Sequence, residues 1–124
     1  MKITPTDNIP FGYKSILKTL WVEGDISKDV KYGFYGGELT RDTLSLEHIQ
    51  CVSKQGKTEL SNLALATKQL NELRGNKPLK FFLQEDKFIQ YIKQFENIKL
   101  KGFDGKKYIE ELIKTVINAL KNNL

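Results

Sequence analysis

The sequence predicts a small α+β domain that is mostly helical, and three observations support that class. Apolar residues recur at helical spacing near both ends of the chain, over 13–22 and 109–124. A short stretch at 44–49 partly alternates apolar and polar residues, as a half-buried strand does. The length of 124 residues suits one modest core, so we expect a single domain over 1–124.

The first part of the chain is expected to hold little regular structure. Prolines and polar residues predict an irregular arm over 1–10. A helix is predicted over 13–22 and should end at Gly24. Tyrosines, a phenylalanine and several glycines over 30–39 are typical of a compact turn.

The middle of the chain holds a strand, a loop and an ambiguous apolar run. The pattern over 44–49 predicts a strand, and the polar stretch 53–61 predicts a loop that turns at Gly56. The run 63–66 fits either a strand or the start of a helix. A helix is then predicted that ends at Gly75, because glycine is favoured just after helix C-termini.

The last third is predicted to be helical. Pro78 can open a helical segment whose apolar face runs from Phe81 to Phe95. Residues 99–107 contain two glycines and predict a loop. Apolar residues over 109–124 follow helical spacing closely, which predicts a core helix or a dimer seam.

Composition excludes several classes of protein. The single Cys51 excludes an intramolecular disulfide and, with only one histidine, a Cys-rich zinc site. No apolar run is long enough to span a membrane, and the N-terminus is too polar for a signal peptide. We therefore expect a soluble, cytoplasmic protein.

The positive charge lies in the second half of the chain. Residues 1–67 carry eight basic and eight acidic side chains, whereas residues 68–124 carry twelve basic and seven acidic ones, which is the whole +5 excess. A basic half is typical of a protein with a polyanionic partner. Surplus lysines on solvated helix faces explain the same count, and composition alone favours that explanation.

An ordered set of residues between Leu44 and Leu79 carries the functional prediction. The set is Glu47-His48, Ser53-Lys54-Gln55-Gly56, Asn62-Leu63, Asn71 and Arg74-Gly75. This order and spacing resembles the HNH endonuclease family, and it covers about a third of the chain. The resemblance implies a ββα-metal core within about 30–79, with a helical extension over 80–124.

The resemblance also implies a role for each residue. His48 corresponds to the general base, because a neutral imidazole can accept a proton from water near pH 7. Glu47 and Asn71 correspond to ligands of a divalent metal, Mg²⁺ or Mn²⁺, which prefers oxygen ligands. Asn62 corresponds to the asparagine that ties down the loop and helps orient the histidine.

Four basic residues are predicted to contact nucleic acid. Arg74 can hold a phosphate by its planar fork, although the dipole of the helix explains a basic residue at its C-terminus equally well. Lys54, Lys57 and Lys77 are weaker candidates that also fit ordinary surface lysines. The implied substrate is DNA, most naturally double-stranded, with a homodimer or a partner protein as the source of any specificity.

Many members of the family bind a structural zinc through two Cys-x-x-Cys pairs. The matching positions here hold Tyr32, Tyr35, Thr67 and Leu70, so no structural zinc is expected. We expect packing of the two tyrosines and the leucine to replace it, at about 1.5–3 kcal/mol for each large side chain.

Two further departures concern the loop after His48. Cys51 stands where the family commonly has proline and is expected to be a small buried residue, while Gln55 replaces the first of two glycines. The main alternative is therefore a catalytically inactive HNH-like module that binds DNA or protein. A purely structural helical protein would explain the last helix and leave the motif to chance.

Overall fold

The structure is a computed structural model that describes residues 16–124. This part of the chain has four α-helices and two small two-stranded antiparallel sheets, which confirms the α+β class. The helices are α1 (Ile16–Val22), α2 (Lys68–Arg74), α3 (Glu85–Lys93) and α4 (Gly105–Lys121). The strands are β1 (Leu44–His48), β2 (Leu63–Thr67), β3 (Lys99–Leu100) and β4 (Phe103–Asp104), and the short 3₁₀ helices are η2 (Val52–Lys54), η3 (Leu60–Asn62) and η4 (Leu79–Phe81). The arm predicted over 1–10 lies outside the described residues, and no described helix is long and apolar enough to cross a membrane.

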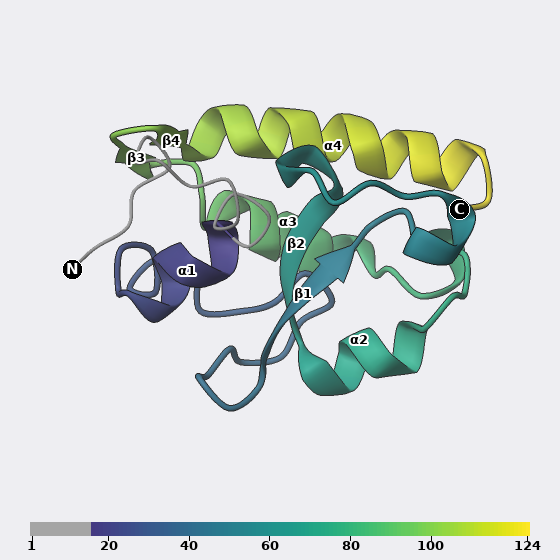
Figure 1. The fold of residues 1–124 in the computed structure, drawn as a ribbon, viewed down its shortest axis with the longest axis horizontal. Helices are drawn as coiled ribbons and strands as arrows, with labels where there is room; N and C mark the ends of the chain where they lie inside the picture. Colours follow the sequence, from purple (N-terminus) through teal and green to yellow (C-terminus); the bar gives the residue numbers. More distant parts are fainter. Residues whose placement is uncertain (1–15) are drawn as a thin grey trace.

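Strands β1 and β2 form an antiparallel hairpin in the middle of the molecule. Leu44 pairs with Thr67 and His48 with Leu63, so the ambiguous run 63–66 is a strand. Helix α2 follows β2 without a connecting loop and packs on both strands, while α4 runs along the opposite side (Figure 1). The chain order in this region is therefore strand, strand, helix.

Helix α2 ends where the sequence predicts. The hydroxyl of Thr67 caps its N-terminus by accepting a hydrogen bond from the backbone N–H of Leu70. Gly75 follows the helix with a φ of 52°, a backbone conformation that residues with a Cβ rarely adopt. The prediction of a helix that ends at Gly75 is confirmed.

The compact turn predicted over 30–39 packs against the junction of β2 and α2. The backbone N–H of Phe34 donates a hydrogen bond to the carbonyl oxygen of Leu65 in β2. A Cβ added at Gly37 would lie 3.1 Å from Cγ2 of Thr67. The two segments in which the resemblance would place zinc-binding cysteines therefore touch one another.

The predicted packing at these positions is confirmed in part. Tyr35 is buried, and Leu70 is partly buried against the core. Tyr32 instead is 42% exposed, which corrects the prediction that it helps to replace a zinc site. The backbone of Tyr32 lies at the surface, where its N–H and C=O bond to the side-chain amide of Gln94.

The C-terminal third departs from the prediction in two places. Pro78 opens only the short η4, α3 begins at Glu85, and Phe81 is 71% exposed, so the apolar face is shorter than predicted. The loop predicted over 99–107 contains the β3–β4 hairpin, and α4 already begins at Gly105.

Helix α4 begins before its apolar stripe because it has an acidic cap. The carboxylate of Asp104 accepts hydrogen bonds from the backbone N–H groups of Lys106 and Lys107. Within the stripe, Ile109, Leu112 and Val116 are buried in the core as predicted, whereas Ile113 and Leu124 are half-buried and Ile117 and Leu120 are exposed.

Two buried tyrosines join the C-terminal helices to β2. The hydroxyl of Tyr91 in α3 accepts from the backbone N–H of Leu65, and that of Tyr108 in α4 donates to the carbonyl of Leu63. The two hydroxyls lie 3.0 Å apart, so Tyr91 donates to Tyr108. Burial raises the pKa of both phenols well above 10. The predicted extension 80–124 thus contributes buried side chains to the central core.

Candidate active site

The five residues of the predicted site lie on one structural unit. Glu47 and His48 end β1, Asn62 directly precedes β2, and Asn71 and Arg74 lie on α2. The structure therefore brings the motif together at the level of the backbone. The side chains, however, have separate partners, which are described one by one.

His48 lies at the end of β1 with a half-buried imidazole. Its Nε2 lies 3.0 Å from Oγ1 of Thr58, ten residues later in the chain. Partial loss of solvation lowers the pKa of His48 below 6.5. The imidazole is consequently neutral at pH 7, the form in which it can accept a proton.

Asn62 braces the loop that follows His48. Its Oδ1 accepts from the backbone N–H of Gln50 at 2.8 Å, and its Nδ2 donates to the carbonyls of Gln50 at 3.1 Å and Lys57 at 2.8 Å. The structure thus places Asn62 as the residue that ties down the loop. Because Lys57 directly precedes Thr58, the same brace sets the position of the hydroxyl that faces His48.

The turn inside this loop restricts two adjacent positions, one by its backbone conformation and the other by lack of space for a Cβ. Gln55 has a φ of 67°, in the left-handed region that favours glycine. A Cβ at Gly56 would lie only 1.8 Å from the carbonyl oxygen of Gln50. Cys51 is buried as predicted, and its thiol contacts the carbonyl of Gly75.

Glu47 lies in the interior of the protein and is already paired. Its Oε2 accepts a hydrogen bond from the hydroxyl of Tyr35 and lies 3.4 Å from Nη1 of Arg74. Glu47 is 5% exposed and Arg74 is fully buried. Burial raises the pKa of the Glu47 carboxyl, against the opposing effects of Tyr35 and Arg74. Because a guanidinium neutralises this carboxylate, its placement does not support the prediction that Glu47 is a metal ligand.

Arg74 has a structural placement, which does not support the prediction that it holds a phosphate. Its Nε donates to the carbonyl of Lys77 at 2.8 Å, and its Nη1 donates to the carbonyl of His48 at 3.0 Å. Its Nη2 lies 3.4 Å from the carbonyl of Leu124. With every nitrogen bonded to the protein and no exposed surface, Arg74 joins the end of β1 to the turn after α2.

Asn71 lies on α2 one turn before Arg74 and, like Arg74, contacts β1. Its Nδ2 donates to Oγ of Ser45 at 2.9 Å and to the carbonyl of Leu46 at 3.2 Å. Leu46 and His48 are two residues apart, so their carbonyls lie on the same edge of the strand. Asn71 and Arg74, three residues apart on α2, bond to these two carbonyls and so cover that edge. The amide oxygen of Asn71 has no hydrogen bond to another described residue, so this predicted ligand atom is not already paired.

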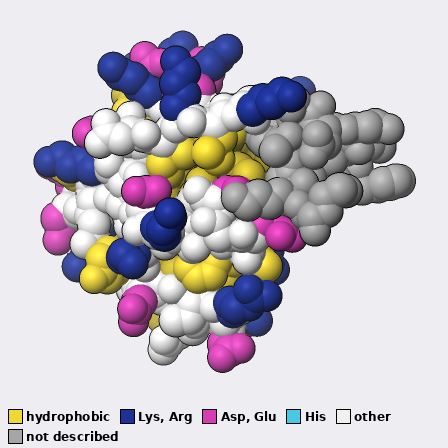
Figure 2. Space-filling view, turned by 90° about the vertical axis from the view of Figure 1, so that its left-hand side faces the viewer, with side chains coloured by type: hydrophobic (Ala, Val, Ile, Leu, Met, Phe, Trp, Pro, Cys, Tyr) yellow, Lys and Arg dark blue, Asp and Glu magenta, His cyan; other side chains and the backbone are white. Residues whose placement is uncertain are grey.

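The three lysines predicted to contact nucleic acid lie outside the buried cluster. Lys57 and Lys77 are exposed and Lys54 is half-buried, and Nζ of Lys77 donates to the carbonyl of Leu73. On the face shown in Figure 2, basic and acidic side chains are interspersed, with hydrophobic side chains exposed between them. The described part of that face therefore carries no continuous basic patch.

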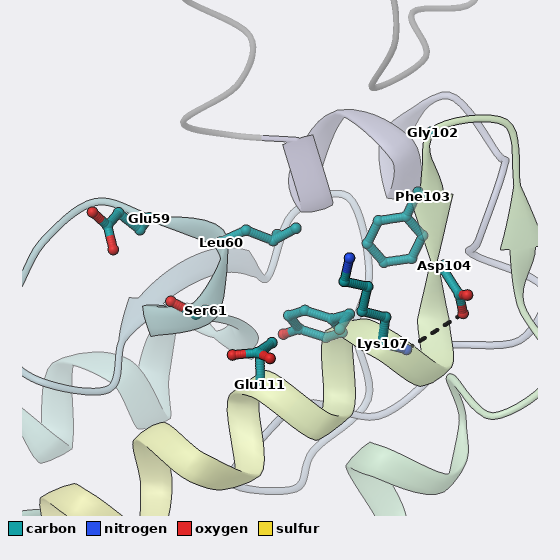
Figure 3. A pocket seen from close by; sticks show the side chains of 9 residues that line it. Glu59, Leu60, Ser61, Gly102, Phe103, Asp104, Lys107 and Glu111 are labelled. Carbon is teal, nitrogen blue, oxygen red and sulfur yellow. Dashed lines mark hydrogen bonds between the residues drawn. The ribbon is translucent and has the colours of Figure 1, made fainter.

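A cavity of about 450 Å³ lies between η3 and the start of α4. Figure 3 shows Glu59 and Phe103 at opposite ends of it, with Lys107 and Glu111 between them. Neither His48 nor Asn71 lines this cavity, so it does not belong to the predicted site.

Two residues that contact the site were missed by sequence reasoning. Thr58 contacts His48, and the Tyr35 hydroxyl contacts Glu47, although Tyr35 was predicted only to pack. Thr58 carries no signal in the sequence, since only the folded loop brings it back to the strand. A buried tyrosine near a buried carboxylate is a signal only after burial is known.

Among known proteins, no family model matches this chain, and no curated protein or solved structure is significantly similar to it. Within residues 16–124, no group of three or more His, Cys, Asp or Glu side chains could hold a metal ion.

Proposed function

We propose that this chain is an HNH-type endonuclease that hydrolyses phosphodiester bonds in DNA, with His48 as general base. The observation that carries the proposal is the strand–strand–helix unit that presents His48 at the end of β1, beside a loop braced by Asn62. A ββα-metal core would place its base and its loop asparagine in this way. The neutral, half-buried imidazole is suited to the task.

The proposed reaction begins with a water molecule beside the imidazole of His48. The imidazole takes one proton from the water, and the water oxygen forms a bond to the phosphorus of the scissile phosphodiester. The bond from phosphorus to the leaving 3′ oxygen then breaks, and that oxygen takes a proton from solvent. His48 releases its extra proton to water, which restores the base.

The resemblance also implies a Mg²⁺ or Mn²⁺ ion at Glu47 and Asn71. Carboxylate and amide oxygens are suitable ligands by type. Glu47 does not fit this role in the described arrangement, because the Arg74 guanidinium lies 3.4 Å from its carboxylate and would repel a second cation. A requirement for Mg²⁺ or Mn²⁺ stays within the proposal, but no step above is assigned to the ion.

Double-stranded DNA is the proposed substrate, and the basic second half of the chain is the source of attraction to it. Twelve basic side chains against seven acidic ones after Thr67 favour a polyanion. Lys54 and Lys57 lie in the loop beside His48 and are the candidates for contacts to the DNA backbone. Binding should therefore weaken steeply as salt is raised. Specificity would come from a homodimer or from a partner protein.

The second candidate function is an HNH-like module that binds DNA or protein without cutting. The pairing of Glu47 with Arg74 and Tyr35 favours it, because the carboxylate that the family uses for its metal is occupied by a protein cation. This module would keep the fold and the charge while the reaction is lost.

Cleavage of supercoiled plasmid separates the two functions. Wild type and His48→Ala are compared in Mg²⁺, in Mn²⁺ and in excess chelator, with Asn97→Ala, an exposed position, as the matched control. The nuclease predicts metal-dependent nicking by wild type and Asn97→Ala that falls by about 100-fold or more in His48→Ala. DNA binding without cleavage would support the module, and no binding at low salt would contradict a DNA substrate.

A further inference from the structure

The hydroxyl of Thr58 is held at a fixed place beside the imidazole of His48. Asn62 bonds to the carbonyl of Lys57, directly before Thr58, and Arg74 bonds to the carbonyl of His48 itself. Both partners of the 3.0 Å contact are thus anchored through their main chains. The contact is a built feature of the loop and not a chance encounter of two mobile side chains.

The direction of this hydrogen bond decides which imidazole nitrogen can act as a base. A hydroxyl can donate to an imidazole nitrogen or accept from it. If Thr58 donates to Nε2, the ring proton of neutral His48 is on Nδ1, and no lone pair is left for water. If Thr58 accepts from Nε2–H, the lone pair on Nδ1 stays available.

We propose that Thr58 is a positioning residue that accepts a hydrogen bond from Nε2–H of neutral His48 and leaves Nδ1 as the atom that takes the proton from water. This inference rests on the proposed nuclease function and adds to it the tautomer and the reacting atom. When Nδ1 takes the proton, the ring becomes positive and its bond from Nε2–H to Thr58 becomes charge-assisted and stronger. The hydroxyl thus orients the base and favours its protonated form during the reaction.

The tautomer can be measured directly, because His48 is the only histidine of the chain. In ¹⁵N-labelled full-length protein at about pH 8, well above the ordinary pKa of histidine, long-range ¹H–¹⁵N spectra distinguish a protonated from an unprotonated ring nitrogen. We expect a protonated Nε2 whose hydrogen exchanges slowly with solvent, and an unprotonated Nδ1. A protonated Nδ1 in wild type would overturn the proposal.

Three variants test the part played by the hydroxyl. Thr58→Val keeps the shape of the side chain and removes the hydroxyl, whereas Thr58→Ser keeps the hydroxyl. Thr115→Val is the matched control, because it removes a hydroxyl that donates to the carbonyl of Glu111 within α4. We expect fast exchange of the Nε2 hydrogen in Thr58→Val alone, with wild-type behaviour in the other two.

The same variants are then compared in plasmid cleavage. Thr58→Val should lower kcat by about 10- to 100-fold with KM little changed, and Thr58→Ser should restore it. Wild-type kcat in Thr58→Val would overturn the inference while the nuclease stands. Failure of the proposed function is a different result: wild type and His48→Ala would then cut equally or not at all, and the role of Thr58 in catalysis would fall with it.

Discussion

Replacement of Arg74 by methionine tests how the end of β1 is held. Methionine is a long side chain that cannot donate hydrogen bonds. In Arg74→Met the buried carboxylate of Glu47 loses its counter-charge, and the carbonyls of His48 and Lys77 lose their donors.

The expected loss of stability follows from burial. Removing one partner of a buried ion pair costs about 3–5 kcal/mol, because the other charge remains buried without compensation. That range applies here, and not the 0–1 kcal/mol that is typical of surface pairs, because the Arg74 side chain is 0% exposed and that of Glu47 is 6% exposed. We expect Arg74→Met to lower the free energy of unfolding by at least about 3 kcal/mol, a large share of the 5–15 kcal/mol of a typical domain. The loss should shrink as pH falls, because a protonated Glu47 needs no counter-charge.

Urea unfolding followed by fluorescence of the single, buried Trp21 measures this loss. Arg41→Met is the matched control, since Arg41 is exposed and makes one long hydrogen bond, to Val22, and it should change stability by no more than about 0.5 kcal/mol. Adding Glu47→Gln to Arg74→Met should recover part of the loss, because it removes the unpaired charge. A loss below about 1 kcal/mol for Arg74→Met, or no recovery in the double variant, would refute the reasoning.

Four further outcomes are expected. Asn62→Ala should cost about 2–3 kcal/mol and speed amide exchange across loop 50–57, because three hydrogen bonds are lost; unchanged exchange would contradict the brace. Tyr108→Phe should cost about 1–3 kcal/mol in urea unfolding by leaving a buried carbonyl and the Tyr91 hydroxyl without their partner, and a neutral effect would count against that network. Gly56→Ala should lower the thermal midpoint, because its Cβ meets a backbone carbonyl at 1.8 Å, and a wild-type midpoint would argue against this loop geometry. His48 should titrate with a pKa below 6.5 by NMR. Because the pKa of His48 is lowered in the folded state, its contribution to the free energy of unfolding is complete above about pH 6.5 and is lost as pH falls through the folded pKa. A folded pKa above 6.5 would reverse this dependence of stability on pH.

The central strand–strand–helix unit was largely predictable because its signals are local. The pattern at 44–49 and the glycine after α2 depend on neighbouring residues, and both predictions are confirmed. The run 63–66 was ambiguous because it is buried on all sides, where neither a strand nor a helix shows its period. Residues 63–66 form a strand because they pair with β1 and bond to the hydroxyls of Tyr91 and Tyr108. These partners are far from 63–66 in the sequence.

The candidate site was predictable only in part, for a related reason. Asn62 lies as expected because it bonds within its own loop. The pair of Glu47 and Arg74 joins residues 27 positions apart, and each alone is typical of a surface charge. Only the packing of α2 on β1 turns the same two residues into a buried pair, which is why the prediction of a metal ligand and a phosphate contact differs from their placement.

Cleavage of supercoiled plasmid by wild type and by His48→Ala tests the central claim most directly. Both proteins are purified identically, and their ¹⁵N spectra are compared to establish that both have the same fold. The account predicts nicking by wild type that requires Mg²⁺ or Mn²⁺ and falls by about 100-fold or more in a folded His48→Ala. Equal cleavage by the two proteins, or no cleavage by wild type under any of these conditions, would contradict it.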